Sequence, residues 1–419
     1  MSNLKKINIT RNDTLLMVAA LTSYTGMYAV RKSFLAGQYL DSDYNGYDFK
    51  TILVISQVLG YMLSKFIGIK IVSEHIPEQR PRMLVTFLSF AMLMLLVFAL
   101  APVHLKPVAL FLNGLPLGMV FGLVLSYLEG RKNTELLVAA LSATFIFSTG
   151  FIKTTGVWLM QSFSVNEYFM PFMTGLLFFP FFLLAVWFLK SSKAPSIEDI
   201  AARSKRTPMN KKQRQNFLKT HGLPFASLVI IYVLLTAVRD FRDNFTVEFW
   251  SELGYANQPS LITLTEIPVA ITVLLIAALG ILIHNNRKAF NWSIYTTLFG
   301  AISLLISTSL FTNGFISPIN WMVWSGLGIY LPYILFHCLV FERFLALLKH
   351  EGTIGYLFYV ADALGYLFSV GILISKEVMD YRGSWTNLFS QLNIYSAFGI
   401  ISISIIILVL NRQKQTITI

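Results

Sequence analysis

Twelve long apolar stretches constrain the fold of this chain more than any other feature of its sequence. Each contains about 20–28 residues, enough for an α-helix to cross the ~30 Å hydrocarbon layer of a bilayer. The chain is 55% hydrophobic and only 13% charged, whereas soluble domains carry about 25% charged residues. We therefore predict an all-α polytopic membrane protein with twelve transmembrane helices. The predicted spans are 13–39, 49–73, 83–102, 106–128, 134–162, 168–190, 222–251, 259–284, 290–312, 317–345, 352–375 and 389–411.

The charges of the loops predict how these helices are oriented. Lysine and arginine collect in alternate loops, whereas Asp41, Asp43 and Asp48 lie in a loop on the opposite side. Because positively charged loops tend to stay in the cytoplasm, both termini are predicted to be cytoplasmic. The predicted cytoplasmic cations are Lys5, Lys6, Arg11, Arg80, Arg82, Arg131, Lys132, Arg287, Lys288, Lys349, Arg412 and Lys414. We expect a monomeric integral protein of the bacterial inner membrane.

The longest polar stretch, 191–221, divides the chain into two parts with six predicted helices each. It carries eight lysines and arginines against Glu198 and Asp199. We interpret it as a basic, partly helical cytoplasmic linker that can contact anionic lipid headgroups. The predicted domains are therefore a bundle over 1–190, this linker, and a second bundle over 222–419. The net charge of +12 comes from such loops and does not indicate nucleic-acid binding.

A three-residue sequence repeat relates the two predicted bundles. Ala29-Val30-Arg31 lies about 18 residues into the first helix, and Ala237-Val238-Arg239 about 17 residues into the seventh. Two bundles with six helices each have the same orientation in the membrane, and this is the parallel repeat of major facilitator transporters. We therefore predict two pseudo-symmetric six-helix bundles with a substrate site between them.

Several cations lie inside the predicted spans, where an unpaired charge costs about 2.5–3.5 kcal/mol. Arg31, Lys65 and Lys153 have no carboxylate within four residues along their own helices. An anionic substrate bound by charge-assisted hydrogen bonds would offset part of this cost. Tyr24 and Tyr28 share a helical face with Arg31, because the three are spaced i, i+4 and i+7. The predicted substrate-binding residues are Arg31, Arg239, Lys65, Lys153, Tyr24, Tyr28 and Tyr330.

Carboxylates inside the spans suggest coupling or gating. Glu266 and Asp362 can pair with cations of other helices or carry protons. Arg239 and Asp243 are spaced i, i+4 and can alternatively neutralise one another, and Arg242 also has Asp243 as a neighbour. The predicted coupling or gating residues are Glu266, Asp362, Arg242 and Asp243.

The residue inventory gives no indication of an enzyme or a cofactor. The single cysteine, Cys338, excludes an internal disulfide and a cysteine-based metal site. No nucleophile–base constellation or metal-ligand spacing stands out. We expect neither metal nor cofactor, and no enzymatic activity.

Two of the helices resemble those of a known transporter family. Tyr24 to Phe34 is similar to the first helix of the organophosphate:inorganic phosphate antiporters, which has two tyrosines followed by Val-Arg-Lys-x-Phe. Gly60 to Ile67 is similar to their Tyr-Gly-x-Ser-Lys-Phe stretch in the second helix. The resemblance implies an antiport cycle in which Arg31 and Arg239 grip a phosphate, with Lys65 and the two tyrosines lining the site. Lys153 stands near the place where that family has a histidine.

The leading hypothesis is a secondary active transporter that moves a small organic anion by rocking-switch alternating access. A phosphorylated metabolite exchanged for phosphate is the first candidate substrate. The alternatives are a proton-coupled symporter of a carboxylate or other anion, and a transporter-like membrane sensor that binds an anionic metabolite without moving it.

Overall fold

The fold is a bundle of long helices with one small hairpin of strands at one end. The computed structural model describes residues 10–40, 43–44, 46–74, 77–128, 131, 133–192, 211–348, 354–381 and 383–416. The first half comprises α1 (Arg11–Lys32), η1 (Ser33–Ala36), β1 (Asp43–Tyr44), β2 (Tyr47–Asp48), α2 (Phe49–Glu74), η2 (Pro77–Gln79), α3 (Arg80–Leu100), η3 (Val103–Leu105), α4 (Lys106–Leu128), α5 (Thr134–Ser142), η4 (Ala143–Phe145), α6 (Phe147–Phe163) and α7 (Met170–Ser191). The second half comprises α9 (Lys211–Asn244), α10 (Thr246–Glu252), α11 (Ser260–Leu264), α12 (Glu266–Ile281), α13 (Asn286–Thr312), α14 (Pro318–Leu335), η5 (Phe336–Val340), α15 (Phe341–Leu347), α16 (Ile354–Val378) and α17 (Trp385–Thr416).

Twelve helical segments of the described residues account for the twelve predicted spans. Eleven of them are long and apolar enough to cross a membrane. The twelfth is α1, whose apolar run from Thr14 to Val30 is bounded by Asp13 on one side and Arg31 on the other. It packs against α4, α6 and α7 inside the first half. The protein is therefore an integral membrane protein, as predicted from its hydrophobic pattern.

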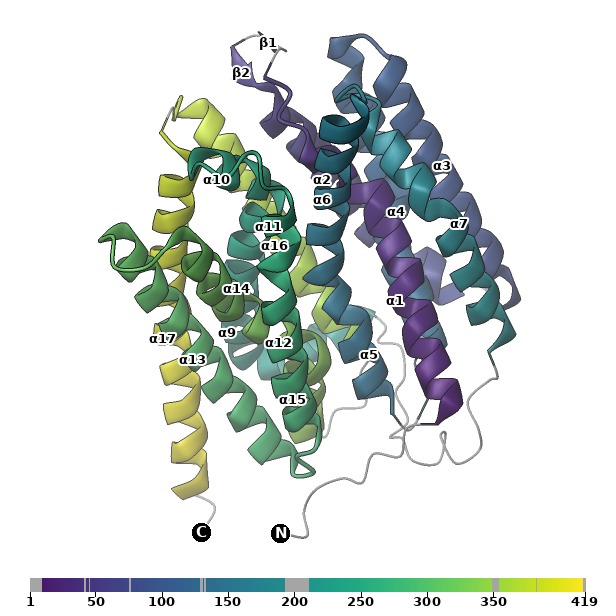
Figure 1. The fold of residues 1–419 in the computed structure, drawn as a ribbon. Coiled ribbons are helices and arrows are strands. Elements are labelled where there is room, and N and C mark those ends of the chain that lie inside the picture. Colours follow the sequence, from purple (N-terminus) through teal and green to yellow (C-terminus); the bar gives the residue numbers. More distant parts are fainter. Residues whose placement is uncertain are drawn as a thin grey trace.

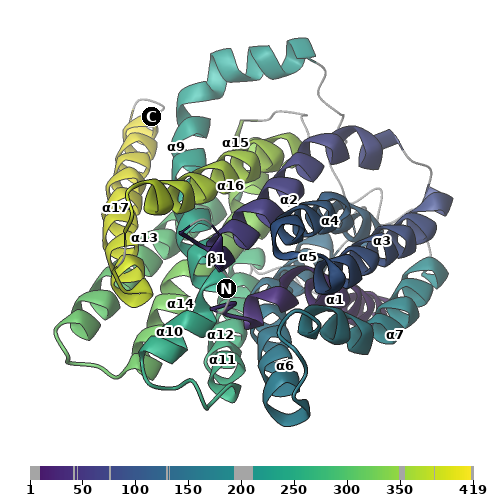
Figure 2. The same ribbon diagram turned by 90° about the horizontal axis from the view of Figure 1, so that it is seen from above.

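The two halves stand side by side, with α1 beginning and α17 ending at the same end of the bundle (Figure 1). We call this the terminal end and the opposite one the far end. Figure 2 shows α2 beside α16 on one side of the molecule and α6 beside α11 and α12 on the other. The halves also meet where α5 contacts α12 and η5.

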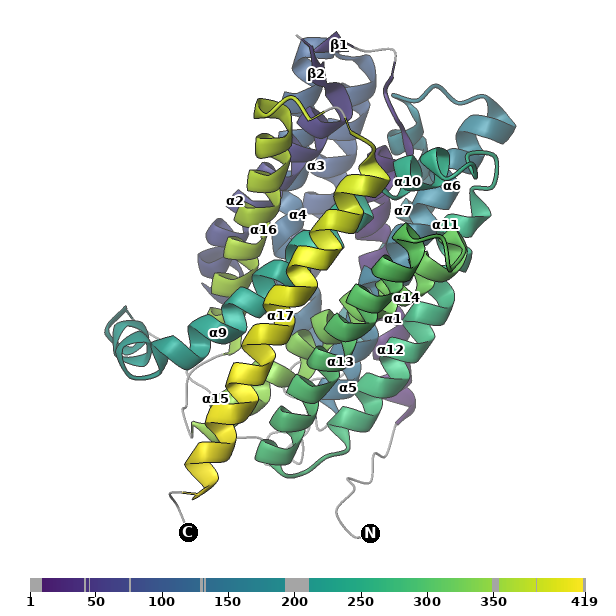
Figure 3. The ribbon, with the colours of Figure 1, turned by 90° about the vertical axis from the view of Figure 1, so that its left-hand side faces the viewer.

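Parts of the predicted orientation and linker lie outside the described residues. These parts are Lys5, Lys6, Asp41, Lys132, Lys349 and the linker residues 193–210. The seventh helix begins at Lys211, earlier than the predicted 222. Its first turns run away from the bundle (Figure 3), and Pro224 lies inside it. Proline interrupts the helical hydrogen-bond ladder and allows such a change of direction.

Close approach of α2 and α4 brings the polar face of α2 into the first half. A Cβ atom on Gly114 would overlap the Gln57 carbonyl, and one on Gly60 would overlap the Phe111 carbonyl. Only glycine permits this backbone contact, which is typical of tightly packed membrane helices. The contact lets Gln57 Nε2 donate to the Arg31 carbonyl at 2.8 Å, so that α2 supports the end of α1.

Two helices change their geometry near the centre of the bundle. The fifth span is not one continuous α-helix, because the 3₁₀ turn η4 separates α5 from α6. The tenth span contains the π-helical segment η5, shortly after Pro332. Local π-helical segments frequently lie at functional sites. These irregular turns carry Phe145 and His337, whose rings are 5.1 Å apart between the two halves.

Candidate functional site

Arg31 lies in the last turn of α1 and rests on an aromatic ring instead of a carboxylate. Its side chain is 1% exposed, and its Cζ atom lies 3.4 Å from the centroid of the Tyr61 ring of α2. A cation over a ring in this way gains about 2 kcal/mol when it is desolvated. The Nε and Nη2 atoms are buried and have no hydrogen-bond partner. The guanidinium therefore keeps N–H groups available for an anion.

Arg239 of α9 has the corresponding environment in the second half. It is 2% exposed, with Cζ lying 4.7 Å from the Tyr333 ring centroid and 5.9 Å from that of Tyr366. Its Nη2 atom donates to the Tyr366 hydroxyl at 3.4 Å, and its Nε atom is buried without a partner. The carboxylate of the adjacent Asp240 lies 3.9 Å from Nη1, at the edge of ion-pair range.

Tyr366 of α16 connects the two arginines, which we call the arginine pair. The Arg31 Cζ atom lies 6.0 Å from the Tyr366 ring centroid, close to the corresponding distance for Arg239. Both guanidiniums thus lie near one ring between the halves. Charge-assisted bonds from two forked donors suit a phosphate or a carboxylate.

Tyr24 and Tyr28 belong to an aromatic cluster on the same face of α1. Their rings are 5.2 Å apart, and both contact Phe145 at 5.9 and 6.4 Å. Phe145 in turn lies 6.1 Å from Tyr333, the ring beneath Arg239. This chain of rings surrounds the arginine pair with apolar walls and hydroxyl groups.

Lys65 lies next to this cluster but is paired. Its Nζ atom is 5.1 Å from the Tyr61 ring centroid and donates to Asp362 of α16 at 3.0 Å. Asp362 also accepts a hydrogen bond from Tyr232, whose hydroxyl lies 3.4 Å from His337 Nε2. The predicted pairing of an interior lysine with Asp362 across helices is therefore present.

Lys153 lies in a different group of charges, which we call the two-lysine bridge. It donates to the Asp243 carboxylate at 3.0 Å, and Lys32 approaches the other oxygen of Asp243 at 2.9 Å. Both lysines belong to the first half and Asp243 to the second. Asp243 thus pairs with these lysines, while of its predicted partners Arg242 pairs with Glu266 and Arg239 lies 3.9 Å from Asp240.

Arg242 pairs with Glu266 within the second half. Its Nη2 atom donates to Glu266 at 2.6 Å, and its Nη1 atom donates to the Met322 carbonyl at 2.7 Å. Tyr330 lies beside this pair, with its ring centroid 5.8 Å from the Arg242 Cζ atom. The structure therefore brings Tyr330 to Arg242 and groups Tyr24 and Tyr28 with the central rings.

Buried cations outnumber buried carboxylates among the described residues, by nine to six. Lys32, Lys50, Lys65, Lys153 and Arg242 each contact a carboxylate at 3.0 Å or less. Lys32 and Lys153 share Asp243, and Asp240 lies 3.9 Å from both Lys32 and Arg239. Within the described part of the chain Arg31 contacts no carboxylate, so positive charge remains at the arginine pair for an anion to neutralise.

Sequence reasoning missed the rings that hold the arginine pair. Tyr61 precedes Lys65 by four residues and Tyr366 follows Asp362 by four, so each shares a helical face with a charged residue. This spacing is the sequence feature that could have indicated Tyr61 and Tyr366 as residues of the site. Tyr232 precedes Arg239 by seven residues, the spacing of Tyr24 and Arg31, and Tyr333 precedes His337 by four, so the same kind of signal was present for them.

Comparisons with known proteins agree with the architecture. A crystal structure of a D-xylose–proton symporter has a TM-score of 0.61 and 13% identity, and covers 93% of this chain and 96% of that one. A mutant of the nucleoside transporter NupG has a TM-score of 0.61 and 10% identity, and covers 94% of this chain and 100% of that one. These likenesses show the major facilitator fold and confirm the fold prediction. They do not support the organophosphate antiporter subtype over others.

The sequence itself matches one described family. No curated protein matches this chain. A family of unknown function, DUF5690, matches residues 33–414. Because this match spans most of the chain, the protein is a member of the DUF5690 family.

Proposed function

We propose that the protein is a secondary active transporter that moves a small organic anion between the two sides of the membrane. The observation that carries this proposal is the arginine pair. Arg31 and Arg239 come from opposite halves, flank the same ring, and hold buried N–H groups without partners. An anion that bridges both guanidiniums would draw the halves together, which is the binding step of rocking-switch alternating access.

A phosphorylated metabolite exchanged for phosphate is the first candidate substrate. The excess of buried cations over buried carboxylates, nine against six among the described residues, favours an anion, and two forked guanidinium groups suit the oxygens of a phosphate. The resemblance of Tyr24 to Phe34 to the organophosphate antiporters supports the same choice. Lys65, Tyr24 and Tyr28 line the proposed site, while Lys153, Asp243, Arg242 and Glu266 contribute to the contacts around it.

Purified protein in proteoliposomes tests the proposal directly. We expect uptake of labelled phosphate into phosphate-loaded vesicles, and loss of about tenfold or more with Arg31→Ala or Arg239→Ala. Hydrogen bonds to charged groups contribute about 1.5–3 kcal/mol, and 1.4 kcal/mol corresponds to tenfold in affinity. The exposed Arg82→Ala is the matched control and should transport normally. Binding of anions without flux would instead favour the membrane sensor.

Proton coupling is the second candidate mechanism, and the contacts of Asp362 favour it. Asp362 is bound by Lys65 and Tyr232, and the Tyr232 hydroxyl lies 3.4 Å from both the Tyr333 hydroxyl and His337 Nε2. Separation of the halves would remove Lys65 and leave a carboxylate free to take up a proton. A pH gradient should then drive anion uptake in wild type and fail to drive it in Asp362→Asn. Exchange that is insensitive to the gradient would support antiport.

A further inference from the structure

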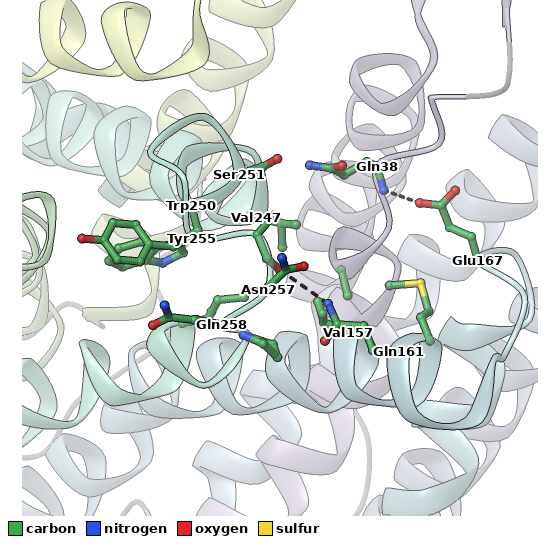
Figure 4. Close-up of a pocket in the computed structure, with 15 residues that line it drawn as sticks. Gln38, Val157, Gln161, Glu167, Val247, Trp250, Ser251, Tyr255, Asn257 and Gln258 are labelled. Carbon is green, nitrogen blue, oxygen red and sulfur yellow. Dashed lines mark hydrogen bonds between the residues drawn. The ribbon is translucent and has the colours of Figure 1, made fainter.

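A pocket lies between the halves at the far end, apart from the arginine pair. It has a volume of about 250 Å³ and is formed by the chain after η1, the last turns of α6, α10 and the segment that leads into α11. Figure 4 shows Gln38 and Gln161 of the first half and Asn257 of the second around a common space. Both halves therefore contribute side chains to it.

The polar groups of this pocket are mainly side-chain amides. Gln38, Gln161, Asn257 and Gln258 belong to its lining, together with the hydroxyl of Ser251. A side-chain amide has two N–H donors and a carbonyl acceptor, and Gln161 Nε2 already donates to the Ala256 carbonyl at 3.5 Å. Such groups match a ligand that both donates and accepts hydrogen bonds at several positions, as vicinal hydroxyl groups do.

Aromatic rings complete one wall of the pocket. Trp250 and Tyr255 are in edge-to-face contact with centroids 5.5 Å apart, and both belong to the lining. Aromatic faces next to a few placed polar groups are typical of small-molecule sites. They provide an apolar surface for the carbon–hydrogen face of a ring-shaped ligand.

The charge of the pocket argues against an anionic ligand. Of the described residues that line it, Glu167 alone carries a charge. Its carboxylate already accepts hydrogen bonds from the backbone N–H groups of Gln38 and Tyr39. A second anion would meet this negative charge without a cation to offset it, so the pocket suits a neutral molecule.

The pocket lies next to the ion pair that Lys153 and Asp243 form between the halves. Val157 and Val247 line it and lie four residues after Lys153 and Asp243, one helical turn further along the chain. The 3.0 Å ion pair of Lys153 and Asp243 thus lies one turn beyond the pocket wall, between it and the arginine pair. The pocket is separated from the central site by this pair.

We propose that the far-end pocket is a binding site for a neutral, hydroxyl-rich molecule of about monosaccharide size. Its volume is below the ~300–1,000 Å³ of typical ligand pockets, which limits the occupant to one small molecule. The site is independent of the arginine pair, so this inference goes beyond the proposed transport of an anion and does not require it.

Ligand-observed NMR on the full chain in detergent tests the site. The probes are D-glucose, D-galactose, D-mannose and D-xylose, each measured by saturation transfer with wild type and with Gln38→Ala/Asn257→Ala. We expect at least one sugar to bind wild type, with about tenfold weaker binding to the double variant, because two hydrogen-bonding side chains are lost. Asn320→Ala, an exposed amide at the same end, is the matched control and should bind like wild type.

The same measurement on Arg31→Ala separates this site from the central one. Unchanged sugar binding by Arg31→Ala is expected. Binding that is lost in Arg31→Ala but kept in the double variant would place the sugar at the arginine pair and overturn the inference, as would absence of binding by all four sugars. Failure of anion transport alone would leave the sugar result intact, so the two proposals fail separately.

Discussion

Lys65 of α2 and Asp362 of α16 form a 3.0 Å ion pair that joins the two halves beside the arginine pair. Both side chains are largely buried, so each charge needs the other as its counter-ion. Tyr232 adds a hydrogen bond to the same carboxylate. The halves are therefore held together at this level by a contact that must break whenever they separate.

Removal of the acid from this pair should destabilise the protein. In Asp362→Leu the Lys65 ammonium stays buried without a counter-ion, and loss of one partner of a buried pair costs about 3–5 kcal/mol. We expect a clearly lower melting temperature in detergent, and recovery of most of the loss in Lys65→Met/Asp362→Leu. A double variant that melts no higher than Asp362→Leu would show that the two residues do not interact.

The two-lysine bridge predicts an order among its variants. In Asp243→Asn, Lys153 loses its carboxylate and Lys32 keeps only the 3.9 Å contact with Asp240, whereas in Lys153→Met the pair of Lys32 with Asp243 at 2.9 Å remains. We therefore expect Asp243→Asn to lower the melting temperature more than Lys153→Met does. Thermal unfolding of the three proteins in one detergent measures the order, and the reverse order would contradict the assignment of both lysines to Asp243.

Helix packing at Gly114 gives a prediction that is independent of charge. A methyl group there meets the Gln57 carbonyl, which must move and thereby shift the support of the Arg31 carbonyl. Forced overpacking typically costs about 1–3 kcal/mol, so Gly114→Ala should melt lower and bind anions more weakly. Gly222→Ala has open space around its Cβ position and serves as the control. Equal melting of both variants would refute the close contact.

The number of helices and the position of the two arginines were predictable because both depend on local sequence. The length of an apolar stretch defines a span, and a cation within a span is a candidate functional residue because its insertion into the membrane costs free energy. The repeated Ala-Val-Arg then gave the correspondence between the halves. The major facilitator fold followed from these features, and the roles of the site residues stay predictions.

The partners of the charges could not be predicted, because they depend on how the helices cross. Asp243 is four residues from Arg239 along α9, yet it pairs with Lys32 and Lys153 of the first half. Helical spacing shows which side chains share a face of one helix. It does not show which residues of another helix contact that face. For the same reason the far-end pocket could not be predicted, because it forms where α6 and α10 meet the loops after η1 and before α11.

The unpaired state of Arg31 leads to a prediction in which stability and function change in opposite directions. Arg31→Met removes a buried charge that contacts no carboxylate within the described residues, and it keeps an unbranched side chain over the Tyr61 ring. A buried charge without a partner is costly, while its cation–π contact returns only about 2 kcal/mol. We therefore expect Arg31→Met to melt at or above the wild-type temperature without ligand.

Phosphate distinguishes this explanation from a purely structural role of the arginine. A ligand at a hundred times its Kd stabilises the native state by about 2.7 kcal/mol, so phosphate should raise the melting temperature of wild type and leave Arg31→Met unchanged. Chloride at equal ionic strength is the control for screening. A large loss of stability in ligand-free Arg31→Met would mean that the guanidinium is satisfied by the protein itself, and the proposed anion site would then lose its basis.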